Sequence, residues 1–81
     1  MRRIYSDVRP ITDTTVHLDF ANYFVVEPAV LITVYGAETN VEVSLVYEFI
    51  DGVGEVYTGV DLTFPAGHVG KKFAILVTAD E

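Results

Sequence analysis

Apolar and polar residues alternate with a period of two along most of the chain, the pattern of β-strands with one buried and one wet face. The clearest case is the segment 14–20, which reads Thr-Thr-Val-His-Leu-Asp-Phe. The segment 41–50 repeats the alternation over a longer stretch, after the turn residues of 36–40. No stretch of useful length shows the 3.6-residue period of an amphipathic helix. The pattern therefore predicts a protein built of strands.

Shorter strands are predicted around these two. They lie at 24–26, 29–35, 55–58, 60–64 and 73–77. Pro28 ends the first of them, because proline removes a donor from the strand ladder. Residues 51–54 are expected to turn a hairpin, since Asp-Gly accepts the positive φ angles of a tight turn, and Gly59 to mark a break or a bulge. Residues 65–70 are expected to form a loop.

Six or seven short strands without helices favour two packed antiparallel sheets, because a single open sheet of this length would leave one face uncovered. A chain of 81 residues is too short for two separate cores. We therefore expect an all-β protein, a single small antiparallel β-sandwich over residues 11–81. An extended N-terminal arm is expected at residues 1–10, up to the change in composition at Pro10.

Several apolar residues occupy positions where the alternation predicts contact with water. They are Val46, Ile50, Ala74, Leu76 and alternate residues of 29–35. Either the strand ends twist so that both faces are buried, or these positions form a contiguous patch that a subunit contact covers. The pattern leaves both explanations open.

Charge is divided unevenly along the chain, whose net charge is −7. Residues 1–9 carry three arginines and one aspartate, whereas residues 10–81 carry two lysines and eleven carboxylates. The acidic body argues against sequence-independent binding of nucleic acid, because it repels the phosphate backbone. The basic arm is either an anchor that reaches an acidic neighbour or a frayed terminus with solvated charges.

Candidate catalytic residues are few. The chain has no cysteine and two histidines, His17 and His68, which make a poor transition-metal set unless carboxylates complete it. Ser6 and Ser44 lack the Gly-x-Ser-x-Gly surroundings of a nucleophile elbow. Carboxylates are plentiful, but so small a sandwich rarely supplies the walls of an enzyme cleft. We expect no enzymatic activity and no cofactor.

Two glycine-containing segments admit a ligand-binding interpretation beside a structural one. Residues 51–55 offer two carboxylates for a weak calcium site, but they lack the evenly spaced Asp and Asn oxygens of an EF-hand loop, and an ordinary hairpin turn is the favoured interpretation. Residues 67–71 carry the Gly-x-x-Gly-Lys pattern, yet the spacing and the helix of a phosphate loop are missing and a strand follows. A glycine-bent strand connection is the simpler interpretation.

No apolar run approaches the roughly 18 residues of a membrane-spanning helix. The first seven residues are not followed by the apolar stretch of a secretory signal. We therefore expect a soluble, unprocessed protein without a membrane partner.

Three segments together resemble small virion proteins of tailed bacteriophages. They are 5–10 (Tyr-Ser-Asp-Val-Arg-Pro), 18–23 (Leu-Asp-Phe-Ala-Asn-Tyr) and 62–75, with its Gly-x-x-Gly-x-x-aromatic turn. The resemblance implies an immunoglobulin-like sandwich and a place in the virion. It also implies a role in capsid decoration, as a cement protein, or in connecting head, tail and fibre as a tail adaptor. Such proteins often continue past the last strand, whereas this sequence stops at Glu81.

The predicted function is therefore that of a non-enzymatic structural protein that docks in symmetric copies, as a homo-oligomer, on a phage particle. Its partners would be other virion proteins: major capsid, portal, adaptor or tail subunits. Arginine and tyrosine are favoured at protein interfaces. The predicted contact residues are Arg2, Arg3, Tyr5 and Arg9 in the arm, together with Tyr57.

Two other function classes stay open. The segment 20–28 is similar to the start of H-type lectin-like domains, which form trimers at phage fibre ends. This resemblance implies a carbohydrate- or receptor-binding module, with exposed aromatic residues such as Tyr35 and Tyr57 near acidic loops. A small inhibitory protein that mimics nucleic acid with its acidic surface is the third interpretation.

Overall fold

The computed structural model of the chain describes residues 2–38 and 40–81 and is built almost entirely of strands. Strands β2 to β6 follow predicted strand segments, because alternation lets a pleated strand bury one face. The elements are β1 (Arg2–Pro10), β2 (Thr15–Phe24), β3 (Ala29–Val34), β4 (Glu42–Ile50), β5 (Gly54–Thr63), the 3₁₀ turn η1 (Ala66–His68) and β6 (Lys72–Asp80). Among the described residues no helix is long and apolar enough to cross a membrane.

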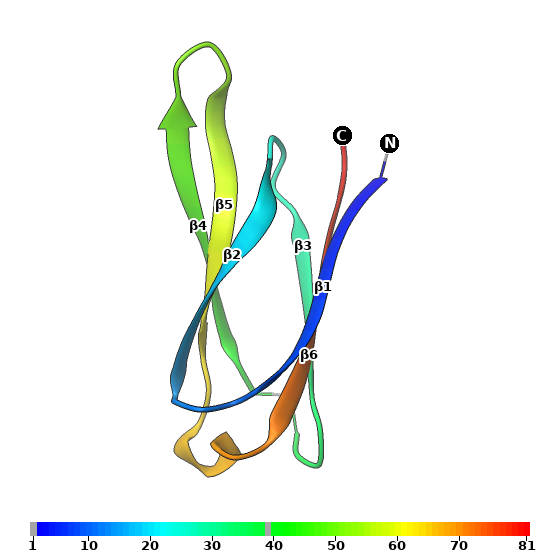
Figure 1. The fold of residues 1–81 in the computed structure, drawn as a ribbon, viewed down its shortest axis with the longest axis vertical. Helices are drawn as coiled ribbons and strands as arrows, with labels where there is room; N and C mark the ends of the chain where they lie inside the picture. The colour runs from blue at the N-terminus through cyan, green and yellow to red at the C-terminus, as the bar shows by residue number, and fades with distance from the viewer. Residues whose placement is uncertain (1, 39) are drawn as a thin grey trace.

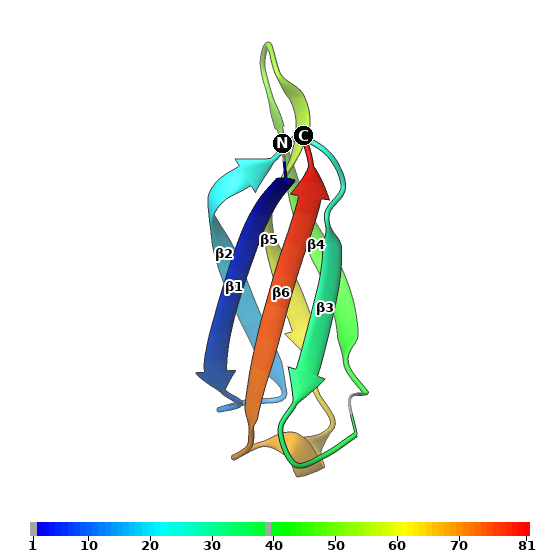
Figure 2. The ribbon, with the colours of Figure 1, turned by 90° about the vertical axis from the view of Figure 1, so that its right-hand side faces the viewer.

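The six strands form two three-stranded antiparallel sheets that face each other (Figure 1). Sheet A has the order β1-β6-β3, with β6 in the centre. Sheet B has the order β2-β5-β4, with β5 in the centre. In Figure 2, β1 lies in front of β2 and β3 in front of β4, so each side of the molecule has one edge strand from each sheet. The predicted all-β class and the pair of packed sheets are confirmed, with six strands.

Large apolar side chains from both sheets fill the space between them. Leu18, Val60 and Leu62 come from sheet B, and Phe73 and Ile75 from sheet A. All five are at most 2% exposed. Burying one such side chain completely contributes about 1.5 to 3 kcal/mol, so the shared core is the main support of the fold.

Gly59 lies within one continuous strand and does not break it. It stands opposite Asp19 on one side and Val46 on the other. A Cβ at this position would meet the Leu18 carbonyl oxygen at 2.5 Å, so only glycine permits this approach of β2. The register changes beside it, between Val46 and Tyr47, which agrees with the predicted bulge.

The segment expected to be an N-terminal arm is strand β1 of sheet A. Arg2 pairs with Asp80 and Pro10 with Lys72, so β1 follows β6 along its whole length. Hydrogen bonding to β6 satisfies the backbone groups of β1 that face β6, and Tyr5 packs against the core. Met1 of the expected arm lies outside the described residues, as does Thr39 of the turn expected at 36–40.

The β4–β5 hairpin reaches beyond the other strands (Figure 1). Its turn follows the predicted Asp-Gly pattern, with Gly52 and Gly54 at positive φ and Val53 N–H donating to the Ile50 carbonyl at 3.0 Å. Because this part of the hairpin projects past the core, Phe49 is 75% exposed. Its alternation with polar residues had placed that side chain on the buried face of the strand.

Candidate functional site

The outer face of sheet A is uncharged across its middle. The outward-facing positions are Ile4, Ser6 and Val8 on β1, Ala74, Leu76 and Thr78 on β6, and Ala29, Leu31 and Thr33 on β3. Leu76 lies between Ser6 and Leu31 at the centre. Among these residues Ile4 is 62% and Leu31 60% exposed. This face includes Ala74, Leu76 and the alternate residues of 29–35 that the sequence placed in contact with water.

The uncharged rows of this face form one continuous patch. They span five residues of each strand, from Ile4 to Val8 on β1 and from Ala29 to Thr33 on β3, and at the usual rise and spacing they cover about 17 Å by 14 Å, or roughly 240 Å². Contiguous apolar patches of about 300 to 600 Å² are the largest that typical monomers expose, and they are often functional. The outer face of sheet A is therefore a candidate contact surface.

The outer face of sheet B is polar by comparison. One row across it joins Thr15, Thr63 and Glu42, and the next joins His17, Asp61 and Ser44. The His17 ring is hydrogen-bonded on both nitrogens, by Nδ1 to Asp61 and by Nε2 to Asp19 at 2.8 Å. These bonds raise the pKa of His17, that to Asp61 more than that to Asp19.

A groove of about 590 Å³ opens between β3 and β4, where the edges of the two sheets part. We call it the β3/β4 groove. Its lining combines two tyrosines, two carboxylates and small apolar residues: Glu27, Pro28, Val30, Val43, Ser44, Leu45, Tyr47, Glu55 and Tyr57. A groove of this size lies within the range of small-molecule and side-chain binding sites.

The β3/β4 groove is electronegative. The pKa of Tyr57 is raised, first by partial burial and then by the negative charges of Glu27 and Glu55. The rings of Tyr57 and Tyr47 meet edge to face, with centroids 6.4 Å apart. Among the described residues, 2–38 and 40–81, the structure shows no ion pair for Glu27 or Glu55. The groove thus joins aromatic surface to uncompensated negative charge.

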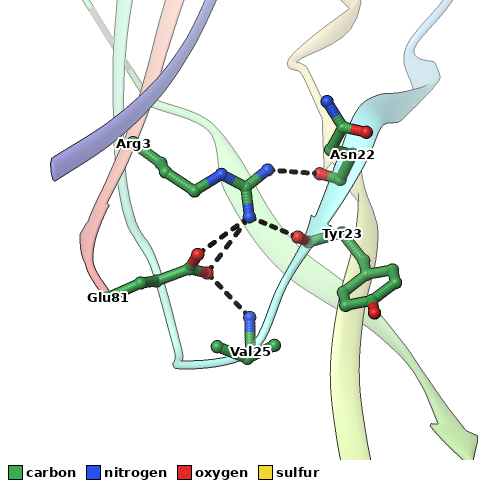
Figure 3. Close-up of polar contacts among 5 residues, drawn as sticks. All are labelled: Arg3, Asn22, Tyr23, Val25 and Glu81. Atoms are coloured by element: carbon green, nitrogen blue, oxygen red, sulfur yellow. Dashed lines mark hydrogen bonds and ion pairs between the residues drawn. The ribbon is translucent and has the colours of Figure 1, made fainter. Parts of the chain in front are cut away.

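The opposite side of the molecule, where β1 meets β2, is closed by Arg3 (Figure 3). Its guanidinium donates to the backbone carbonyls of Tyr23 and Asn22 and pairs with Glu81 at 3.0 Å. It also lies over the Phe24 ring, 4.5 Å from the centroid. We call this group the Arg3 clamp.

Glu81 completes the Arg3 clamp from the other end of the chain. It accepts a hydrogen bond of 2.8 Å from the Val25 N–H. The bond from Arg3, followed by that from Val25, lowers the pKa of the Glu81 carboxyl. The clamp therefore ties the first strand, the end of the second and the C-terminal residue together.

Four of the five predicted contact residues lie on β1, but they have different surroundings. Arg2 is at its start, with a side chain 66% exposed and 3.6 Å from Asp80. Arg3 belongs to the clamp. Tyr5 is half-buried, with its ring centroid 5.4 Å from that of Phe20. Of these three, Arg2 is the most open to a partner.

The other two predicted contact residues are Arg9 and Tyr57. Arg9 pairs with Asp7 on its own strand at 2.6 Å, which lowers the pKa of the aspartate. Tyr57 lies across the molecule in the β3/β4 groove, so the structure does not gather the five residues at one place. The sequence missed the groove itself, because Glu27, Tyr47 and Glu55 are far apart in the chain.

The ligand-binding alternatives of the two glycine segments find turn geometry in the structure. Residues 51–53 form the hairpin turn, and the loop after β5 contains η1. His68 of η1 is hydrogen-bonded through Nε2 to the Glu38 carbonyl at 2.8 Å. Within the described part of the chain, no three histidine, aspartate or glutamate side chains are placed to hold a metal ion.

Comparison of the chain with protein-family models, with curated proteins and with solved structures found no match. The function is therefore argued from the surfaces described above.

Proposed function

We propose that this protein is a non-enzymatic structural module that docks in copies on a larger protein assembly. The observation that carries the proposal is the uncharged outer face of sheet A, with Leu76 at its centre and Ile4 and Leu31 beside it. Such a face gains free energy when another protein surface covers it, because apolar area leaves water. Its roughly 240 Å² is about a third of what one partner contributes to a standard interface, which suits a subunit held by several small contacts.

The assembly that we propose is the particle of a tailed phage. The support is the sequence resemblance to small immunoglobulin-like virion proteins, and a capsid-decoration or head-tail adaptor role is the specific form. The immunoglobulin-like type is part of the same proposal. An assembly also suits the size of the domain, since a chain this short buries only about 60% of its unfolded surface by itself.

A particle-binding experiment with matched variants tests this function. The tagged chain is produced in cells where the particle assembles, and particles are purified on a density gradient. We expect wild type to sediment with the particles and Leu76→Lys, at the centre of the outer face of sheet A, to stay behind. Thr63→Lys, exposed on the central strand of sheet B, should sediment as wild type does. Particles that carry Leu76→Lys at wild-type levels would exclude this face as the docking surface.

Deletion of residues 1–10 is not a suitable test of docking. These residues include β1, an edge strand of sheet A, and the Arg3 clamp. Their removal would damage the fold along with any contact. Single substitutions on the outer face separate the two effects.

A carbohydrate-binding module of a phage fibre is the second candidate. The observation that favours it is the pair of tyrosines in the β3/β4 groove, with Glu27 and Glu55 beside them, because sugar sites combine aromatic faces with carboxylates. A glycan array probed in the presence of calcium tests it, with Tyr57→Ala as the matched variant. Binding that this variant abolishes would support the sugar site, and a silent array would exclude it.

A further inference from the structure

Ion pairs are confined to one side of the molecule. In the described residues, every ion pair includes a residue of β1 or β2. The pairs are Arg2–Asp80, Arg3–Glu81, Arg9–Asp7, His17–Asp19 and His17–Asp61. On the opposite side, Glu27 and Glu55 of the β3/β4 groove face two tyrosines and no cation that the structure describes. The groove therefore offers negative charge to a cation that binds from outside.

The lining of the groove suits a guanidinium group. Arginine stacks its planar face on tyrosine rings and donates to carboxylates with its edge, and the groove offers both partners in Tyr47, Tyr57, Glu27 and Glu55. Calcium fits less well, because it requires about six to eight oxygen ligands and the lining holds two carboxylates. The volume of 590 Å³ leaves room for the side chain and part of the strand that presents it.

The chain itself presents an available arginine. All three of its arginines lie on β1. Arg3 is held in the clamp, and Arg9 is held by Asp7 at 2.6 Å. Among residues 2–38 and 40–81, Arg2 has a single ion pair, a 3.6 Å contact with Asp80, whose side chain is 78% exposed, and such exposed pairs contribute little. Arg2 can therefore change partners at small cost.

Arg2 and the groove lie at the same level of sheet A, on opposite edges. Arg2 stands opposite Asp80 on one edge of β6, and Ala29 stands opposite Thr78 on the other edge. The starts of β1 and β3 are therefore close in height (Figure 2), and Glu27 and Pro28 of the groove directly precede β3. Arg2 points to the outer face of sheet A, as Ile4 and Ser6 do. A second copy beside β3 must therefore also be rotated, so that this face of its β1 turns toward the mouth of the groove.

We propose that copies of this chain associate head to tail, with Arg2 of one copy bound in the β3/β4 groove of the next. Arg2 would stack on Tyr47 or Tyr57 and donate to Glu27 and Glu55. This is a heterologous contact, because the two surfaces differ, and it forms a ring if the rotation closes or a filament if it does not. The proposal rests on the proposed function in one respect, because docking on an assembly places copies of the chain next to one another.

Sedimentation equilibrium of the purified chain tests the contact. We expect the mass of wild type to rise with concentration in low salt, and to fall toward the monomer in about 0.5 M salt, where screening acts within a few ångströms. Arg2→Ala and the double variant Glu27→Gln, Glu55→Gln should each weaken association by about tenfold or more, since each removes one side of the charge pair. Circular dichroism confirms folding, which these exposed positions should not affect.

Mixing the two variants gives the sharpest outcome. Arg2→Ala keeps an intact groove and the double glutamine variant keeps an intact Arg2, so an equimolar mixture should form a heterodimer that grows no further. A symmetric contact would instead stop wild type itself at a dimer, whereas the head-to-tail contact lets wild type grow further. A wild-type monomer at about 1 mM, or full association of Arg2→Ala, would overturn the proposal.

The matched variant Leu76→Lys separates this contact from docking. It should associate head to tail as wild type does and yet fail to sediment with particles. Wild type that sediments with particles but stays monomeric in solution would exclude the head-to-tail contact and leave the proposed function standing. Self-association without particle binding would exclude the proposed function and leave the contact standing. If the chain does not self-associate and a glycan shifts the nuclear magnetic resonance signals of Tyr47 and Tyr57, the groove is a sugar site instead.

Discussion

The two sides of this protein differ in how the edges of sheet A and sheet B meet. Each side brings together one edge strand from sheet A and one from sheet B. Where β1 meets β2, Arg3 spans the sheets, covers Phe24 and is held by Glu81. Where β3 meets β4, the sheets part into a groove lined by two tyrosines and two glutamates.

The two sides also differ in where polar side chains bond to the backbone. On the closed side, the guanidinium of Arg3 satisfies backbone carbonyls of β2 that lie outside the regular ladder, in the region where the register shifts between Asp19 and Phe24. On the open side, the His68 ring bonds the Glu38 carbonyl in the connection between β3 and β4 at 2.8 Å, but among the described residues no such bond crosses the β3/β4 groove. Strands β3 and β4 are edge strands, as β1 and β2 are. Unpaired edges are sites where further strands or partners add.

Truncating one aromatic residue on each side should give the largest difference in stability between the two sides. Phe24→Ala on the closed side should cost about 3 to 5 kcal/mol, because the ring is 1% exposed and packs edge to face on Phe20. Tyr47→Ala on the open side should change stability by no more than about 0.5 kcal/mol, since that ring is 62% exposed. Urea unfolding of both variants measures the difference, and equal losses would mean that both sides support the fold alike.

The Arg3 clamp should show a smaller effect. Arg3→Ala should cost about 1 to 2 kcal/mol, because charged hydrogen bonds to two carbonyls and the contact with Phe24 are lost together. Arg2→Ala on the same strand is the matched control and should cost less than about 0.5 kcal/mol, since its ion pair is exposed. Thermal unfolding of the two variants side by side checks this order. A larger loss in Arg2→Ala would show that the clamp does not close this side.

Acid should weaken the closed side selectively. The folded pKa of Glu81 lies below its ordinary value of 4.5, chiefly because Arg3 donates to it. Its contribution to stability is therefore complete above pH 4.5 and is lost as the pH falls through the lower folded pKa. Unfolding curves between about pH 3 and 6 should show a drop in wild type that Glu81→Gln reduces. An unchanged drop in that variant would assign the acid sensitivity to other carboxylates.

The smallest effect is expected at His17, on β2 of the closed side. Its pKa is raised above 6.5 by Asp61 and then by Asp19, so its contribution is complete below pH 6.5 and is lost as the pH rises through the folded pKa. Nuclear magnetic resonance titration of the imidazole should give a pKa above 6.5. Asp61→Asn should lower that pKa more than Asp19→Asn does, and the reverse order would contradict the bonding in the structure.

The sequence by itself determined most of the strands and the class of fold. Alternation at 14–20, 41–50 and 73–77 placed β2, β4 and β6, because a period of two permits burial of only one strand face. It also indicated part of the outer face of sheet A, since Leu76 and alternate residues of 29–35 were apolar where contact with water was expected. Arg2 and Tyr57 were both predicted contact residues, although nothing in the pattern related them to each other.

Only the tertiary structure decided which residues meet. Strand periodicity gives the face of a side chain but not its neighbour across the sandwich, so Arg3 and Glu81, at opposite ends of the chain, meet only when β1 pairs with β6. For the same reason, the sequence did not predict the strand at residues 2–10. Their composition is mostly polar, and the strand is stabilised by its pairing with β6. Tyr47 is exposed because the hairpin outruns the core, and hairpin length relative to the opposing sheet is a property of the packed fold.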